Sequence, residues 1–491
     1  MNKTDSFTSK WAFIFSALGM AIGAGNIWRF PRIAAQNGGG AFLIAWMIAL
    51  FIWSIPIIIL EFAIGSRAKA GVIKAFGIIC GRSYCWMGGF IAFCTTAIMF
   101  YYSVVTGWCI RYMLFALKSN ILHSDPHILW NNFISGNTPV LFHLISISLA
   151  AFVVSLGIAK GIEKINNILI PTLFFLIAIA ATKALFLPNA EKGLRFLFYP
   201  DIGRLLDYRI WLEAITQSAW SVGPGWGLIL TYAVYSRKDQ DIVSTSVIVG
   251  LGNNLASILA GIAVICTLFA FLPKQEALKV AETGNVGLTF LWLPSIFKKI
   301  SHAHIFIFVF FLCLSSAAFS SLIAMVELGV RVLMDMGIRR EKASILIASV
   351  GFFMGIPSAI NMNFFCNQDW VWGIGLLVGG FFVTVSAIKY GVSRFRKELI
   401  NTSETRLKVS AWFDVLIKYL IPAEFFGLIS WWFYKAVKFE SKSWWNPFHK
   451  YSIATCIFQW GIVLIALMLL NKKLSEIREL GWSMDKKKVD I

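Results

Sequence analysis

Charged side chains are scarce in this sequence, at 14% of its 491 residues, whereas hydrophobic residues make up 58%. A soluble domain has roughly a quarter charged residues, so this chain is not built around one water-exposed core. Apolar runs long enough to cross a bilayer recur along almost its whole length. The composition therefore indicates an integral membrane protein that contacts the lipid bilayer.

Cysteine and histidine are also few, at eight and six residues. The sequence has no CxxC pair and no Cys/His cluster, so a structural metal centre is not expected. Histidines such as His123, His127, His302 and His304 fall in or near expected loops without a matched nucleophile. Because covalent catalysis needs a nucleophile beside a base, we expect a protein that is not an enzyme.

Acidic residues are outnumbered by lysine and arginine, 25 to 44, which gives a net charge of +19. Such a charge can indicate nucleic-acid binding, but here the basic residues cluster in alternate loops. This placement follows the positive-inside bias of membrane proteins, with exceptions at 189–209 and 273–302. It predicts a multi-pass protein of the plasma (inner) membrane with both termini in the cytoplasm and no nucleic-acid partner.

Long hydrophobic runs, by contrast, are abundant. The hydropathy criterion predicts about 12 transmembrane helices, mostly joined by short loops. A longer connection at 273–302 is expected to contain two short helices. The expected spans are, roughly, 11–35, 41–64, 86–117, 140–158, 166–187, 210–235, 243–272, 303–334, 343–360, 370–392, 411–436 and 450–471.

Two of these spans are interrupted near their middle. Residues 19–26 read Gly-Met-Ala-Ile-Gly-Ala-Gly-Asn, and residues 223–227 read Gly-Pro-Gly-Trp-Gly. Glycine and proline weaken helices, and broken backbone is tolerated inside a membrane only where protein encloses it. Breaks at matching places in two halves are typical of inverted-repeat transporters with a midplane binding site.

We therefore predict an all-α membrane protein with an inverted repeat of 5+5 helices, in which the first and sixth helices are unwound. The whole chain, 1–491, is expected to form a single transmembrane transporter domain. Its predicted parts are a cytoplasmic N-tail (1–10), the first repeat (11–187), the second repeat (210–392), two additional helices (411–471) and a cytoplasmic tail (472–491).

Neutral oxygen-bearing side chains stand in or near both breaks. Asn26 lies in the first break, Ser221 lies two residues before the second, and Ser320 and Ser321 are adjacent in the eighth span. Sodium prefers such oxygen ligands, together with carbonyl groups freed by unwinding. Hydroxyl groups in membrane helices also often bond back to their own backbone, and composition alone does not separate the two roles.

Two pairs of neutral hydrogen-bonding residues have helical spacing. Gln217 and Ser221 are four residues apart, as are Asn253 and Ser257, so each pair shares one helix face. Four such donors on two spans could surround an anion. They could equally join neighbouring helices by hydrogen bonds.

Ionisable residues within the expected spans are few, namely Glu61, Glu327 and Asp369, with Arg29 at the outer end of the first span. Such residues are costly in a membrane and are usually paired or functional. We expect the two glutamates to hold broken backbone by accepting amide hydrogen bonds. We expect Arg29 and Asp369 to form an ion pair that opens and closes.

Several motifs together resemble the neurotransmitter:sodium symporter family, which includes the bacterial leucine transporter. They are Gly-Asn-Ile-Trp-Arg-Phe-Pro at 25–31, Asn-Gly-Gly-Gly-Ala-Phe at 37–42, Tyr101-Tyr102, Gly107-Trp108, and Arg-Lys-Asp-Gln-Asp-Ile at 237–242. The resemblance covers about 7–470. It implies a sodium-coupled symporter that works by alternating access.

The resemblance also implies ligand sets for two sodium ions. The first set is Ala21, Asn26, Ser221 and Asn253, to which the substrate carboxylate adds a ligand. The second set is Gly19, Ile22, Ala317, Ser320 and Ser321, of which the first three contribute backbone carbonyls.

It further implies a substrate site and two gates. The substrate residues are Ala21, Gly23, Ala24, Gly25, Ile98, Tyr102, Val105, Trp220, Ser221, Gly223, Trp226, Ser321 and Met325, with Tyr102 binding the carboxylate. Arg29, Gln217 and Asp369 would form the outer gate, and Tyr235 and Asp335 the inner gate. The position of the arginine that usually completes the inner gate is Thr4 here, so either Lys3 or another group replaces it or this contact is weak.

Three departures from the family pattern bear on the transported molecules. Gly23 stands where monoamine transporters have an aspartate for the amine, which favours a substrate with its own carboxylate. Ser257 stands where chloride-independent bacterial members have a glutamate. This predicts a chloride site of Trp46, Gln217, Ser221, Asn253 and Ser257, although Trp46 replaces a tyrosine and donates one hydrogen bond without accepting any.

The side-chain part of the expected site is apolar, so the prediction is a sodium- and chloride-dependent importer of a neutral, hydrophobic amino acid. An osmolyte or amino-butyrate transporter is the alternative, because these substrates also have a carboxylate. A non-transporting amino-acid sensor of the same fold is a further alternative. The sequence does not indicate which amino acid binds, the stoichiometry or the oligomeric state.

Overall fold

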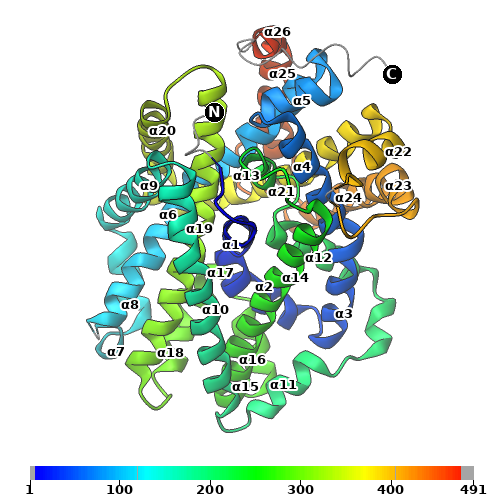
Figure 1. Ribbon diagram of the computed structural model, residues 1–491. Helices are drawn as coiled ribbons and strands as arrows, with labels where there is room; N and C mark the ends of the chain where they lie inside the picture. The colour runs from blue at the N-terminus through cyan, green and yellow to red at the C-terminus, as the bar shows by residue number, and fades with distance from the viewer. Residues whose placement is uncertain (1–5, 119, 404, 477–491) are drawn as a thin grey trace.

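The computed structural model describes residues 6–118, 120–403 and 405–476. These residues form helices joined by turns, with no strand among them (Figure 1). The predicted all-α class is therefore confirmed. The predicted ends at 1–5 and 477–491, which include Lys3 and Thr4, lie outside the described residues.

Within the described ranges, eight helices are long and apolar enough to cross a membrane, and a bent pair makes up to nine. The bent pair is α1 (Lys10–Ala21) and α2 (Ala24–Gln36). The eight are Gly40–Ala68 (α3, η1 and α4), Arg82–Leu117 (η2 and α6), Thr138–Ser155 (α9), Ile158–Leu185 (η3 and α10), Ile242–Phe271 (α14, η5 and α15), Ala303–Asp335 (α19), Arg340–Ile360 (α20) and Met362–Tyr390 (α21).

The other three expected spans are helical as well but do not meet that criterion. The span expected at 210–235 is broken into α12 (Tyr208–Val222) and α13 (Leu228–Ala233). The span expected at 411–436 is formed by α23 (Trp412–Val415), η8 (Leu416–Leu420) and α24 (Ile421–Phe439), and the last is α25 (Ile453–Leu469).

Short helices cap the two ends of the bundle. One end has α5 (Val72–Cys80) and α26 (Asn471–Ser475), and Figure 1 shows α11, α16 and α18 at the opposite end. The two short helices expected at 273–302 are present as α16 and as a second stretch from α17 to α18. The connecting helices are α7 (Asn120–His123), α8 (Pro126–Ile134), α11 (Ala190–Phe198), η4 (Ile202–Leu206), α16 (Lys274–Ala281), α17 (Gly284–Val286), η6 (Gly287–Trp292), α18 (Leu293–Phe297), α22 (Val392–Phe395) and η7 (Arg396–Ile400).

The first break separates α1 from α2, which are bent by 52°. Helix α1 is capped by Ser9, whose side chain accepts a hydrogen bond from the Ala12 amide at 3.0 Å. It ends because Ile22 and Gly23 adopt extended backbone. The Asn26 side chain then accepts a hydrogen bond from the Gly23 amide at 3.0 Å, and α2 begins at the next residue, Ala24.

The second break depends on glycine. Gly223, Gly225 and Gly227 have φ values of 84°, 85° and 72°, a region that other residues rarely adopt. A Cβ on Gly225 would also stand 2.3 Å from the backbone nitrogen of Gly380. Only glycine therefore fits this crossing between the second break and α21.

Two neighbouring helices hold the second break in place. The Gly225 amide donates to the Glu61 carboxylate at 2.6 Å, and the Thr95 hydroxyl donates to the Trp226 carbonyl at 2.6 Å. The expected role of Glu61 in holding broken backbone is thus confirmed. The same expectation for Glu327 was wrong, because its carboxylate instead pairs with Arg340 at 2.6 Å.

Candidate functional site

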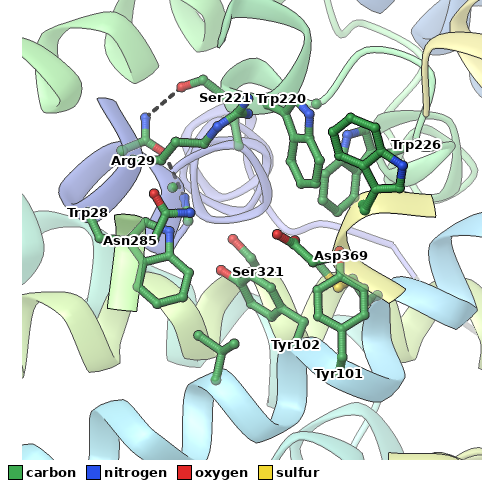
Figure 2. A pocket seen from close by; sticks show the side chains of 18 of the residues that line it. Trp28, Arg29, Tyr101, Tyr102, Trp220, Ser221, Trp226, Asn285, Ser321 and Asp369 are labelled. Atoms are coloured by element: carbon green, nitrogen blue, oxygen red, sulfur yellow. Dashed lines mark hydrogen bonds between the residues drawn. The ribbon is translucent and has the colours of Figure 1, made fainter. Parts of the chain in front are cut away.

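A cavity of about 230 Å³ lies where the two broken helices meet (Figure 2). Its walls come from both breaks and from α6, α19 and α21. Trp220 and Trp226 stand together on one side with ring centroids 6.2 Å apart, and Trp28 lies on another side. The cavity is therefore positioned by the unwound backbone that the sequence predicted.

Most predicted substrate residues line this cavity, but Ala24 and Ile98 do not. Both are fully buried, and Ala24 contributes through its amide, which donates to the Tyr102 hydroxyl at 3.0 Å. The predicted residues that line it are Ala21, Gly23, Gly25, Tyr102, Val105, Trp220, Ser221, Gly223, Trp226, Ser321 and Met325.

The floor of the cavity is backbone at Gly23 and Gly25. A Cβ on Gly23 would stand 2.8 Å from the Tyr102 hydroxyl and 3.0 Å from the Ser321 hydroxyl, so a side chain is excluded there. A Cβ on Gly25 would meet no described atom within 4 Å. The two glycines therefore differ: the first brings backbone against hydroxyl groups, and the second leaves open space.

The four residues predicted for the first sodium ion are brought together. The Asn26 amide nitrogen lies 3.0 Å from the Ser221 hydroxyl and 2.7 Å from the Asn253 side-chain oxygen. That Asn253 oxygen also lies 3.1 Å from the carbonyl oxygens of Ala21 and Ser221. The converging oxygen atoms suit a cation, and turning the Asn253 amide over would instead let its nitrogen donate to both carbonyls.

Asn26 itself differs from its predicted orientation. Its oxygen accepts from the Gly23 amide, and its nitrogen faces the other members of the group and the Ser257 hydroxyl, at 2.8 Å. In this arrangement Asn26 connects α2 to α12 and α14 by hydrogen bonds. Coordination of a cation by its oxygen requires the amide to turn.

The residues predicted for the second sodium ion form two contacts. The Ser321 hydroxyl lies 3.2 Å from the Gly19 carbonyl oxygen, 3.3 Å from that of Met20 and 3.5 Å from that of Ile22. The Ser320 hydroxyl donates to the Ala317 carbonyl in its own helix at 3.0 Å. Backbone carbonyls at the end of α1 thus lie close to the Ser321 hydroxyl of α19. One of these carbonyls belongs to Met20, which was not among the predicted ligands.

The predicted anion residues include buried donors without partners. Gln217 and Trp46 are 1% and 0% exposed, and neither the Gln217 amide group nor the Trp46 indole N–H finds a hydrogen bond among the described residues. Leaving a buried polar group unpaired costs about 1–3 kcal/mol. Gln217 does not line the cavity, so it lies apart from the other two predicted outer-gate residues.

Arg29 and Asp369 both line the cavity, but within the described part of the chain no ion pair joins them (Figure 2). The Arg29 guanidinium instead stacks on Trp220, 4.8 Å from its ring centroid. Beyond Arg29, a second hollow of about 290 Å³ continues past Arg32 and Trp432. The ion pair expected between Arg29 and Asp369 is therefore not formed in this structure.

Several cavity residues were not predicted from the sequence. Arg32 and Asn285 make the outer part polar, joined by a hydrogen bond of 2.8 Å from the Arg32 Nε atom. The expectation of an apolar lining therefore applies only to the part of the cavity next to the breaks. The unpredicted lining residues are Met20, Trp28, Arg32, Tyr101, Asn285, Phe365, Trp370, Ile374 and Trp432.

The two predicted inner-gate residues belong to two neighbouring ion pairs. The Tyr235 hydroxyl donates to Glu327 at 2.6 Å, and Arg340 donates to that hydroxyl at 3.0 Å. Asp335 pairs with Arg331, one turn earlier in α19, at 2.7 Å. Arg331 also lies 5.5 Å from the Tyr235 ring centroid. Among the described residues, the cationic partner of Asp335 is therefore Arg331, whereas Lys3 and Thr4 lie outside them.

The N-terminal segment closes the same end. Phe7 is 1% exposed and donates its amide hydrogen bond to the Tyr235 carbonyl at 3.2 Å. Its ring contacts Phe13 and Tyr232, with centroid distances of 5.2 and 5.9 Å. The cavity is therefore open past Arg29 and sealed at the end that contains Phe7.

Comparison with known proteins agrees with this architecture. A family model described as the sodium:neurotransmitter symporter family matches residues 4–134 and 134–476. The structure of MhsT in complex with L-phenylalanine is similar, with a TM-score of 0.75, 28% identity, and coverage of 87% of this chain and 99% of that chain.

Two sequence relatives extend the comparison. An uncharacterized sodium-dependent transporter of Methanocaldococcus jannaschii is 32% identical, covering 85% of this chain and 88% of its own length. The sodium- and chloride-dependent GABA transporter 2 of Rattus norvegicus is 24% identical, covering 93% and 86%. The family is one of transporters, not enzymes. This chain belongs to the sodium:neurotransmitter symporter family and is a multi-pass, sodium-dependent membrane symporter.

Proposed function

We propose that this symporter imports a neutral, hydrophobic amino acid across the plasma (inner) membrane by alternating access. The observation that carries this proposal is the floor of the cavity, where the Tyr102 hydroxyl meets the unwound backbone at Gly23 and Ala24. Hydroxyl and amide groups there suit a carboxylate. The carboxylate of Asp369 lines the outer part of the cavity. A substrate amine bound at the floor would therefore not have this carboxylate as its counter-charge, which disfavours amines that lack a carboxylate of their own.

The walls next to this floor favour a hydrophobic side chain. Val105, Trp220, Trp226, Met325 and Ile374 line the cavity, and apolar surface of this kind binds apolar groups. MhsT was solved with L-phenylalanine, a neutral hydrophobic amino acid. An osmolyte or an amino-butyrate also has a carboxylate but would leave more of these walls without contact.

The oxygen clusters support two sodium ions as co-transported cargo. The first would bind the carbonyl oxygens of Ala21 and Ser221 with Asn253, and with Asn26 once its amide has turned. The second would bind the carbonyls of Gly19, Ile22 and Ala317 with Ser320 and Ser321. Neither set contains a protein carboxylate, so both ions could be released, and the substrate carboxylate would add a ligand to the first.

Chloride would supply the missing counter-charge. Two cations in a low-dielectric site are stabilised by a nearby anion, and the unpaired donors of Gln217 and Trp46 support one beside Ser257. We expect uptake to fall about tenfold or more when gluconate replaces chloride. The Ser257→Glu variant, which carries its own negative charge, should transport equally in both media. Equal uptake by the unaltered protein in both media would rule the chloride site out.

A thermal-shift screen tests the substrate. The twenty amino acids, amino-butyrate and common osmolytes would be added with sodium and chloride varied separately. A ligand at a hundred times its Kd adds about 2.7 kcal/mol of stability, so a neutral hydrophobic amino acid should give the largest sodium-dependent shift. In Asn26→Ala, the sodium dependence of that shift should disappear. Its persistence would contradict the first sodium site.

The non-transporting sensor is tested by accumulation. Residues for closure are present on both sides of the cavity, with Arg29 and Asp369 outside and Tyr235, Glu327 and Arg340 inside, which supports transport. Sodium-driven accumulation of the substrate in proteoliposomes would support transport, and binding without accumulation would support the sensor.

The end of the bundle that contains α5, α26 and Phe7 would face the cytoplasm. The two inverted repeats of the transporter would be residues 11–187 and 210–392.

A further inference from the structure

Three buried polar side chains without partners lie on three different helices. Ser16 on α1, Asn166 on α10 and Tyr232 on α13 are each 0% exposed. The Ser16 hydroxyl, both amide atoms of Asn166 and the Tyr232 hydroxyl have no hydrogen bond to any described residue. Burying a polar group without a partner destabilises a protein, so an arrangement that keeps three of them fits a polar ligand. We call these three residues the inner polar cluster.

The members of the cluster lie together beside the second set of sodium ligands. A Cβ on Gly19 would meet the Asn166 side-chain oxygen at 2.9 Å, so Asn166 packs on the turn whose carbonyl faces Ser321. The Tyr232 hydroxyl lies within interaction range of the Asn166 side chain, although neither group has a hydrogen-bond partner of ordinary geometry among the described residues. Ser16 precedes Gly19 by three residues and therefore lies on the same face of α1.

The cluster is also the next polar group toward the sealed end. The Phe7 ring packs against the ring of Tyr232 and against Phe13. Contacts thus run from Gly19 to the Asn166 side-chain oxygen, from Asn166 to the Tyr232 hydroxyl, and from the Tyr232 ring to Phe7. An ion that left the second set toward this end would meet these oxygens first.

We propose that the inner polar cluster is a waiting site for a sodium ion, with its remaining water, between the second sodium site and the cytoplasm. Hydroxyl and amide oxygens are suitable ligands for sodium, and without a charge among them the ion is held weakly and moves on. The proposal rests on the proposed second sodium site. It adds a step in which the ion leaves the carbonyls of α1 before Phe7 moves.

The test replaces the three side chains with apolar ones of similar shape: Ser16→Ala, Asn166→Leu and Tyr232→Phe. In proteoliposomes, the triple variant should take up the substrate about tenfold more slowly, since each 1.4 kcal/mol added to the barrier is tenfold in rate. The sodium concentration that half-stabilises the substrate-bound protein in a thermal-shift titration should stay unchanged. Release would be slowed while equilibrium binding from the outside is retained.

Matched controls separate this effect from a general loss of hydroxyl groups. Ser344 and Tyr112 are also buried, at 1% and 0% exposure, and their hydroxyls are likewise unpartnered within the described ranges. Ser344→Ala and Tyr112→Phe, outside the cluster, should leave the uptake rate unchanged. If the triple variant does not fold, Tyr232→Phe alone removes one oxygen with the shape retained and should still slow uptake.

Two results would overturn the proposal. Unchanged uptake by the triple variant would show that the cluster has no role in sodium release. A shifted sodium titration would place these side chains in the sodium site itself. Either result leaves sodium-driven uptake by the unaltered protein in place, so failure of the waiting site is distinct from failure of the proposed function.

Discussion

Gly23→Ala is expected to weaken substrate binding by about tenfold to a hundredfold, because overpacking a tight site costs about 1–3 kcal/mol. The added methyl would stand 2.8 Å from the Tyr102 hydroxyl and 3.0 Å from that of Ser321. It would displace the group proposed to bind the carboxylate and disturb the hydroxyl that faces the carbonyls of α1. Sodium-dependent thermal shift and uptake would measure both effects.

Gly25→Ala is the matched control for this result. Its methyl would meet no described atom within 4 Å and would only occupy part of the open cavity. We expect it to keep sodium-dependent binding and to shift preference toward smaller amino acids. If both alanine variants bound the same substrate as the unaltered protein does, the proposed carboxylate cradle at Gly23 would be wrong.

Arg340→Ala is expected to destabilise the sealed end by about 3–5 kcal/mol, because it leaves the Glu327 carboxylate buried without its cationic partner. The two side chains are 9% and 0% exposed and 2.6 Å apart, and the Tyr235 hydroxyl contacts both. Thermal unfolding should occur at a clearly lower temperature, and sodium-driven uptake should be largely lost.

Two comparisons isolate the pair. The double variant Arg340→Met with Glu327→Leu removes both charges, so it should regain most of the thermal stability without restoring normal uptake. Arg394 pairs with Glu398 at 2.8 Å, but there the side chains are 52% and 44% exposed, and Arg394→Ala should change neither measurement. A Tm for Arg340→Ala equal to that of Arg394→Ala would contradict a stabilising role for the buried pair.

The helices and both breaks could be predicted because hydropathy and glycine content are local properties. The expected span at 41–64 appears as Gly40–Ala68, and that at 303–334 as Ala303–Asp335. The span at 210–235 does not meet the membrane-crossing criterion because its break leaves two shorter helices. The span at 450–471 falls short because its helix extends only over Ile453–Leu469, and the span at 411–436 is not among the membrane-crossing helices either.

The site was less accessible to prediction where it depends on tertiary contacts. Asn285 comes from the short helix α17 and Trp432 from α24, and no local pattern places them in the cavity. Arg32 was more accessible, since it follows Arg29 by three residues on the same face of α2. The Arg331–Asp335 pair has helical spacing, but the family resemblance directed attention to Thr4 instead. Glu327 and Arg340 are brought together only by the turn between α19 and α20.

The Asn26 side chain has a thermodynamic consequence. One amide contacts Ser221 and Asn253, which belong to the proposed sodium set, and Ser257, which belongs to the proposed anion set. Occupants of two such sites share one coupling free energy, and its effect is reciprocal. Whatever factor chloride contributes to sodium affinity, sodium must contribute to chloride affinity, so a titration of either ion at fixed levels of the other measures the same quantity.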